Sequence, residues 1–428
     1  MYRQALALSV GLTLCAPTAL PQASSSALTA NQLVEAALST NREFLSLRQR
    51  ITEAKGLVKQ AGVKPADNLD VSGLAGQAFG NKGEDALNLT YSHTFETFGK
   101  RGKRVAVAEK EMALAQAELD KRRIALSFEV KTRYGDAVIE QRKLAVIDRL
   151  LGINRDYLRL TEARVGTGDA APLEADLLRV ELNRDEAQRM LTDGRLRAAV
   201  LQLKATLDIA ATSPLPIAAN LTPPTFDDNL QHLKTRALTS RPDARALRIT
   251  EDQTGTQSAL AKVETKPNLT LLGQYSHADN AFDQYGLTAA GALTPIRDHI
   301  DYLGIGVSIP LTTSHRNRGN IEAAVARQTG AKLRREYLEA VISTQVEAAY
   351  EHWRAAREAT TVFSQGVLAQ SEKNLAVMRQ AYTLGELRLI DILNEQRRLL
   401  DTVLGYIDAQ GDLFRAYAEL EQATGGFL

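Results

Sequence analysis

The sequence predicts a mainly α-helical protein with long antiparallel coiled-coil hairpins and four β-strands per chain that belong to a membrane β-barrel. Three observations lead to this prediction. Proline-free segments of about 60 residues carry apolar side chains at spacings of three, four and seven. Shorter segments alternate in the manner of β-strands. The order of these segments occurs twice within the 428 residues, which indicates a tandem duplication.

Composition excludes several classes of protein. The 52 basic and 51 acidic residues nearly cancel, so neither a nucleic-acid groove nor a strongly acidic partner is implied. Aromatic residues make up 5% of the chain and tryptophan occurs once, which is too little for the core of a compact enzyme. Alanine, leucine, glutamate and arginine are abundant, as is typical of long helices.

The first 27 residues have the pattern of a signal peptide. One arginine precedes the apolar run ALALSVGLTLCA, which is too short to cross a bilayer as a helix, and cleavage is expected after Ser25 or Ala27. Cys15, the only cysteine, excludes an intrachain disulfide. It lies where a bacterial lipoprotein carries its acylated cysteine, so it is either lipidated or removed with the leader.

Four pairs of segments occur in the same order in the two halves. The first repeat spans residues 28–210, the second spans 230–428, and a proline-rich crossover (211–229) joins them. We expect the crossover to lie across the helices at mid-length. The paired segments are AALSTNRE (36–43) with RALTSRPD (236–243), VKPADNLDVSGLAG (63–76) with TKPNLTLLGQYSHA (265–278), LTYSHTFETFGKRGKR (89–104) with IGVSIPLTTSHRNRGN (305–320), and the turn at Gly168 with the turn at Gly385.

Each repeat has a short helix followed by two alternating segments of roughly 9–11 residues, a length that suits transmembrane β-strands. Four strands cannot close a barrel, and lipid does not tolerate an open sheet edge, so several chains must share one barrel. The alternative is a soluble four-stranded sheet on a helical body. The expected strands are 68–79, 86–97, 267–278 and 301–311, with polar, glycine-containing loops at 80–85 and 279–300.

The remaining long segments are predicted to form two helical hairpins. A helix of about 60 residues would be about 90 Å long, which a compact domain does not need. The abundant alanine on the apolar stripes allows close helix packing. The expected helices are 100–165, 170–210, 316–383 and 387–424.

Each hairpin reverses at a glycine that is followed by an acid. Gly168 and Gly385 supply the backbone freedom that a tight turn needs. Asp169 is predicted to cap the returning helix, and Pro172 suits its first turn because the missing N–H would be unpaired there. Both tips should project away from the strands.

Three motifs resemble those of the TolC-type outer-membrane efflux channels, and the resemblance extends over essentially the whole mature chain. AYTLGELRLIDIL (381–393) and RVGTGDAAPLEADLLR (164–179) are similar to the two hairpin tips of that family. FGKRGKRVAVAE (98–109) is similar to a glycine- and arginine-rich stretch of its cobalt-zinc-cadmium branch.

This resemblance implies a homotrimer with a 12-stranded β-barrel in the bacterial outer membrane and an α-helical tunnel in the periplasm. Its partners would be a periplasmic adaptor protein and an inner-membrane pump of the resistance-nodulation-division class. The expected cargo is heavy-metal cations, with drugs or proteins of type I secretion as alternatives. A duct of this kind catalyses no reaction.

The resemblance also implies a pore gate where the tips of three subunits converge. Asp391 matches the first pore-lining aspartate of the family, whereas the second, three residues on, is Asn394 here. Glu174 is the equivalent of Asp391 in the first repeat, and Tyr382 matches a tyrosine that latches neighbouring coils. The alternative role of Asp391 and Glu174 is to stabilise the N-terminus of a helix. The tip residues that would contact the adaptor are Arg164, Gly168, Asp169, Gly385 and Glu386.

Other chemistry is not predicted. The six histidines lack the close spacing of a metal site, no glycine-rich loop is placed to bind phosphate, and no serine nucleophile motif is present. We therefore expect no enzyme activity, no cofactor and no resident metal. Two alternatives from another class remain, a periplasmic coiled-coil scaffold and a periplasmic adaptor, although neither explains duplicated strand pairs.

Overall fold

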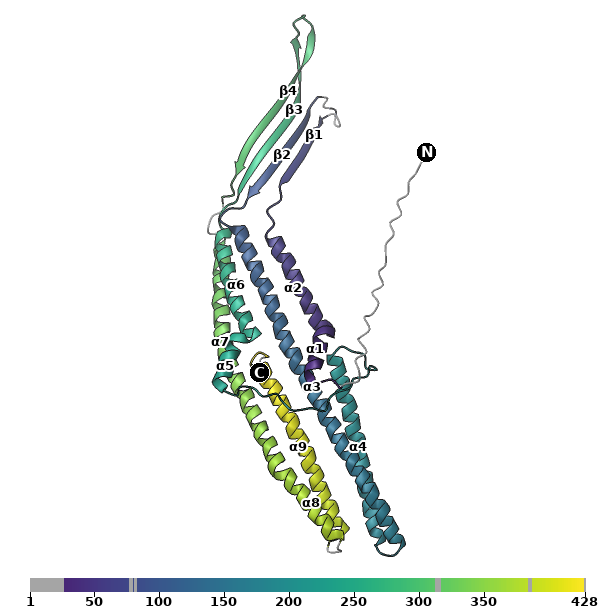
Figure 1. Ribbon diagram of the computed structural model, residues 1–428. Coiled ribbons are helices and arrows are strands. Elements are labelled where there is room, and N and C mark those ends of the chain that lie inside the picture. The colour runs from purple at the N-terminus through teal and green to yellow at the C-terminus, as the bar shows by residue number, and fades with distance from the viewer. Residues whose placement is uncertain (1–26, 77–79, 81–82, 312–316, 384–386, 427–428) are drawn as a thin grey trace, which may run out of the picture.

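A computed structural model describes residues 27–76, 80, 83–311, 317–383 and 387–426. The predicted leader and Cys15 therefore lie outside the described residues. Figure 1 shows a long, narrow molecule with the β-sheet at one end, the hairpin tips at the other and helices between them. This arrangement confirms the prediction of a mainly helical chain with four strands.

The four strands form one antiparallel sheet in the order β1-β2-β3-β4. The central pair joins the two repeats, because β2 of the first repeat lies beside β3 of the second, with Leu89 opposite Tyr275. Within the single chain, β1 and β4 are the edges. The strands are β1 (Asn68–Ala75), β2 (Asp85–Phe95), β3 (Leu269–Leu287) and β4 (Leu293–Ser308).

The segment 279–300, expected to be a loop, is mostly strand. β3 and β4 continue as a paired hairpin, with an irregularity between Ala281 and Tyr285, up to a turn in which Gly291 has φ +83°. The prediction was wrong because exposed apolar residues such as Phe282, Leu287 and Ile296 are mixed with polar and charged ones along this extension, so no regular alternation marks its strands. The backbone ladder joins the two strands, and His299 of β4 pairs with Asp279 of β3.

The two faces of the sheet differ in polarity. Register places Val71, Leu89, Leu271 and Ile305 on one face, which remains largely exposed in the single chain; Ile305 is 85% exposed. The other face is mainly polar and carries Ser72, Asn88, Thr90, Gln274 and Ser276, with Leu74, Leu272 and Tyr302 among them.

The helical body consists of two hairpins, each preceded by a pair of shorter helices. The expected single short helix in each half is divided in two. Asn41 ends α1 and caps α2 by accepting from the Phe44 N–H at 2.9 Å, and Pro242 opens α6. The helices are α1 (Ala30–Thr40), α2 (Arg42–Ala61), α3 (Lys100–Gly166), α4 (Pro172–Thr206), α5 (Leu230–Ser240), α6 (Pro242–Glu264), α7 (Arg318–Val362), α8 (Leu368–Thr383) and α9 (Leu389–Ala423).

The expected helix 316–383 is also interrupted. A π-helical turn, Phe363–Val367, separates α7 from α8, whereas α3 of the first repeat is continuous over 67 residues. Phe363 lies against the Gly405 backbone of α9 and near the Tyr406 ring, with ring centroids 6.5 Å apart. A methyl group added at Gly405 would be in ordinary van der Waals contact with this ring, 3.5 Å from its nearest atoms.

The core lies at mid-length, where the crossover between the repeats passes over α3. The buried Tyr134 hydroxyl donates to the Ala218 carbonyl at 2.5 Å and to the Asn220 carbonyl at 3.0 Å. Arg142 donates to the Ala219 carbonyl at 2.6 Å. These contacts hold the crossover in the position expected from its sequence. No described helix is long and apolar enough to cross a bilayer.

Candidate functional site at the hairpin tips

The first tip is a tight turn between α3 and α4. Gly168 has φ +81°, and the Asp169 N–H donates to the Arg164 carbonyl at 2.8 Å, which closes the end of α3. The exposed Arg164 guanidinium donates to the Asp169 carbonyl at 3.3 Å. The turn therefore needs a glycine at 168, because a side chain is strained at this φ.

Asp169 does not cap α4, contrary to the prediction. The N-cap is Ala171, which makes no side-chain capping bond, and Pro172 is the first helical residue. Because two residues separate Asp169 from the helix, its carboxylate instead accepts from the Thr167 hydroxyl at 2.7 Å.

The second tip is described from Leu387 onward, so Gly385 and Glu386 lie outside the described residues. Tyr382 belongs to α8, and its side chain is likewise outside the description. Asp391 is in the first turn of α9, where its Oδ2 accepts from the Arg388 N–H at 3.3 Å and lies 3.4 Å from the Arg388 Nε. In the single chain, Asp391 thus stabilises the start of its own helix.

Asp391 and Glu174 occupy equivalent positions in the two repeats. Each is the third residue of a returning helix, and each backbone N–H bonds to the residue three before it: Ala171 for Glu174, at 3.0 Å, and Arg388 for Asp391, at 3.1 Å. Both carboxylates are half-buried, whereas Asn394, one turn further on in α9, is exposed. Figure 1 shows the described parts of both tips at the end opposite the sheet.

Behind the tips, the two hairpins meet in a small apolar cluster. Leu178 of α4 packs with Leu389 and Leu393 of α9, and all three side chains are buried. Tyr157, Leu158 and Leu177 pack against them. The position of Asp391 is therefore coupled to the packing of α9 against the first hairpin.

A polar layer follows this apolar cluster. The Arg397 guanidinium of α9 makes a bidentate ion pair with the buried Glu181 carboxylate of α4, with a distance of 2.9 Å from Nε to Oε1. The Asn154 amide donates to the buried Asp185 carboxylate at 2.7 Å. Within the described chain, both amide atoms of Gln396 and the Oδ1 atom of Asn154 are buried without a hydrogen-bond partner.

Burial raises the pKa of Asp185 above the ordinary aspartate value, and the nearby Glu181 charge raises it further. The hydrogen bond from Asn154 opposes this shift but does not cancel it. Two carboxylates and one guanidinium thus share the interior between the hairpins, and burial makes Asp185 easier to protonate than an exposed aspartate.

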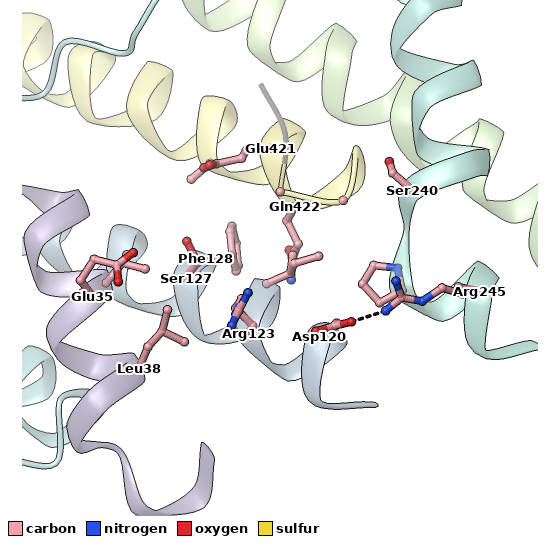
Figure 2. Close-up of a pocket in the computed structure, with 16 residues that line it drawn as sticks. Glu35, Leu38, Asp120, Arg123, Ser127, Phe128, Ser240, Arg245, Glu421 and Gln422 are labelled. Carbon is pink, nitrogen blue, oxygen red and sulfur yellow. Dashed lines mark hydrogen bonds and ion pairs between the residues drawn. The ribbon is translucent and has the colours of Figure 1, made fainter. Parts of the chain in front are cut away.

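A hollow with a volume of about 410 Å³ lies at mid-length, away from the tips. Figure 2 shows that the seam between α1, α3, α6 and the end of α9 encloses it, and that Arg245 reaches across from α6 to Asp120 of α3. Glu421, which lines the hollow, pairs with the buried Lys131. The Arg245–Asp120 and Lys131–Glu421 pairs are each neutral. In the described ranges, no three His, Asp or Glu side chains are arranged to hold a metal ion. The hollow is a helix junction.

Comparison with known proteins gives the family. The model of the outer membrane efflux protein family matches residues 33–207 and 233–426, which are the two repeats. The chain belongs to this family. Its members are channels and not enzymes.

Named relatives agree with this assignment. The chain is 24% identical to the cobalt-zinc-cadmium resistance protein CzcC of Cupriavidus metallidurans over 95% of this chain and 92% of that protein. It is 26% identical to the nickel-cobalt-cadmium resistance protein NccC of Alcaligenes xylosoxydans xylosoxydans over 59% of this chain and 53% of that protein. Its fold is similar to the crystal structure of the outer membrane protein VceC of Vibrio cholerae, with a TM-score of 0.69, 19% identity and coverage of 93% of this chain and 96% of VceC.

Proposed function

We propose that three copies of this efflux protein form one gated duct, with a 12-stranded β-barrel in the outer membrane and an α-helical tunnel in the periplasm. The observation that carries the proposal is a sheet with one apolar, exposed face and two edges, β1 and β4. Apolar residues facing outward and polar residues facing a lumen are typical of membrane barrels. Lipid excludes open edges, so β1 of one copy must pair with β4 of the next.

The helices have the length that such a tunnel requires. At 1.5 Å per residue, the 67 residues of α3 extend about 100 Å. The scaffold and adaptor alternatives are set aside, because the family model covers both repeats.

Disulfide cross-linking tests the shared barrel. Cys15 is the only natural cysteine, so a variant with one cysteine introduced in β1 and one in β4 shows whether those two positions meet between chains. We expect variants that combine Leu69→Cys or Val71→Cys with Leu303→Cys, Ile305→Cys or Val307→Cys to yield covalent dimers and trimers in membranes, in one register only. Monomers in every combination would exclude the barrel, and a ladder beyond trimers would exclude ring closure at three.

We further propose that the cargo is heavy-metal cations, delivered by a resistance-nodulation-division pump through a periplasmic adaptor. The names of CzcC and NccC support this proposal, as does the similarity of residues 98–109 to the cobalt-zinc-cadmium branch of the family. Expression in a host that lacks its own metal-efflux duct but retains pump and adaptor should restore tolerance to Co²⁺, Zn²⁺ and Cd²⁺. Restored drug tolerance or protein secretion, with metal tolerance unchanged, would favour the alternative ducts.

The proposed gate consists of a ring of Asp391 carboxylates and the Glu174 carboxylates, with Asn394 and Tyr382 beside them. Three like charges brought close together attract cations and repel one another. Because Asn394 is neutral, Asp391 supplies a single ring in α9. The tip residues Arg164, Gly168, Asp169, Gly385 and Glu386 are proposed to contact the adaptor.

A further inference from the structure

The basic stretch after β2 has no role in the duct proposed above, and the structure divides its residues into two sets. Lys100 and Arg104 share one face of the first turns of α3 and are used within the chain. The buried Lys100 donates to the Asn268 side chain at 2.7 Å and to the Lys266 carbonyl, while Arg104 pairs with Glu96, with a distance of 3.0 Å from Nη2 to Oε2. Lys100 thus ties the start of α3 to the residues just before β3, and Arg104 ties it to the residue just after β2.

The second set consists of cations that form no ion pair within the described chain. Arg101 is exposed and Lys103 is half-buried, and neither forms an ion pair with any described residue. Both lie in the first turn of α3, which contains no acid, so they oppose the helix dipole. Cations that weaken the helix they belong to indicate a role outside the chain.

An exposed cation also occurs at the other crossings between strand and helix. Lys64 lies between α2 and β1, Lys266 between α6 and β3, and Arg318 at the start of α7. Of these, Arg318 pairs with Glu322, while Lys64 and Lys266 form no ion pair within the described chain. Figure 1 shows the strands meeting the helices at one level of the molecule.

Exposed apolar side chains lie beside these cations. Phe98 is 58% exposed although its φ of +56° is strained for a bulky residue, so it is neither buried nor relaxed in the single chain. Val63 is next to Lys64, and Leu269 is three residues after Lys266. We call this set the boundary belt: Val63, Lys64, Phe98, Arg101, Lys103, Lys266, Leu269 and Arg318.

We propose that the boundary belt binds the headgroups of anionic phospholipids in the leaflet nearest the helices; this inference rests on the proposed barrel. Aromatic side chains concentrate at membrane–water interfaces, and lysine and arginine reach from an apolar surface to phosphate. Clustered cations at a membrane surface attract anionic lipid. The belt would thereby fix the depth at which the sheet ends and the tunnel begins.

Electron paramagnetic resonance of spin-labelled lipids tests this inference on the full-length protein in bilayers. The spectrum separates lipid in contact with protein from bulk lipid, for labelled phosphatidylglycerol and labelled phosphatidylcholine in turn. We expect phosphatidylglycerol to be preferred by about fivefold at low salt, the factor that one basic residue near an anionic surface provides. The preference should fall in high salt, because exposed charges are screened.

Two triple variants locate the preference. The preference for phosphatidylglycerol should be lost in the belt variant Lys64→Gln/Arg101→Gln/Lys266→Gln. It should remain in the control variant Arg48→Gln/Arg149→Gln/Arg195→Gln, which loses the same charge from exposed positions along α2, α3 and α4. Equal affinity for both lipids, or an equal loss in both variants, would overturn the inference while the barrel stands. If added inorganic phosphate abolished the preference for phosphatidylglycerol, and another salt at the same ionic strength did not, the belt would bind a soluble anion instead. Absence of any protein-contacting lipid would overturn the barrel as well.

Discussion

Gly168 shows at the scale of one residue why the first tip favours glycine. Its φ of +81° is a conformation that costs other residues about 1–2 kcal/mol. Gly168→Ala should therefore lower the stability of the protein by about 1 kcal/mol, measured by thermal unfolding in detergent.

Gly194 is the matched control: it lies within α4, and nothing within 4 Å would meet an added methyl group. Gly194→Ala should raise stability by about 0.5–1 kcal/mol. Equal effects of the two substitutions would refute the role of the turn.

Asp185 is expected to make stability depend on pH. Its pKa is raised in the folded protein, so the folded state binds a proton more readily than the unfolded state. The cost of burying its charge is present at neutral pH and is relieved as pH falls through the raised pKa.

Asp185→Asn should therefore raise Tm at pH 7, and the gain should shrink as the pH is lowered toward the raised pKa. Asp176→Asn is the control, because the Asp176 carboxylate is exposed and pairs with Arg179. A gain for Asp185→Asn that does not change with pH would show that its charge is not the cause.

Spacing alone could have identified the carboxylates between the hairpins. Leu178, Glu181 and Asp185 follow one another at intervals of three and four, so Glu181 and Asp185 occupy core positions of α4. Their partners could not be predicted, because Arg397 lies 216 residues away from Glu181 and belongs to the other hairpin. Asp169 was misassigned as a cap because the sequence does not show how many residues the turn consumes.

At the scale of elements, the ion pair between α4 and α9 joins the two hairpins. Arg397→Leu would leave the Glu181 charge buried without its partner, which typically costs about 3–5 kcal/mol. Replacing both residues, Glu181→Leu/Arg397→Leu, should recover most of that loss, as measured by thermal unfolding. The control, Arg159→Leu, removes an exposed pair with Asp156 and should change stability by less than about 1 kcal/mol. A double variant no more stable than Arg397→Leu would contradict this account.

The long elements were predictable because each carries a periodic pattern over many residues. The prediction of one helix in the second hairpin missed the π-turn. The one residue that a π-turn adds leaves the apolar pattern recognisable in the helices on both sides, so the sequence shows no break. The hairpin extension of β3 and β4 was missed for the opposite reason, because its exposed residues mix polar and apolar side chains without a regular pattern. Backbone hydrogen bonds, which every sequence can form, decide the structure there.

At the scale of the whole molecule, the polarity of the two sheet faces decides how the chain meets lipid. Ile305 lies on the apolar face and Gln274 on the polar face, on neighbouring strands one residue apart in register. Ile305→Lys should destabilise the membrane-inserted protein by about 2–4 kcal/mol and lower the trimer yield in outer-membrane fractions. Gln274→Lys faces the proposed lumen and should leave the yield unchanged. The reverse order of effects would mean that the faces have been assigned the wrong way round.

The central claim is that the assembled chains form a duct with its constriction at the hairpin tips. Single-channel conductance in planar bilayers, for wild type and Asp391→Ala, tests it most directly. We predict discrete, cation-selective openings in the wild type, with cation selectivity reduced and conductance raised in the variant, because the variant loses the carboxylate ring and the contact with Arg388 that holds the start of α9. Openings identical in both proteins would contradict the gate, and protein that never inserts would contradict the duct itself.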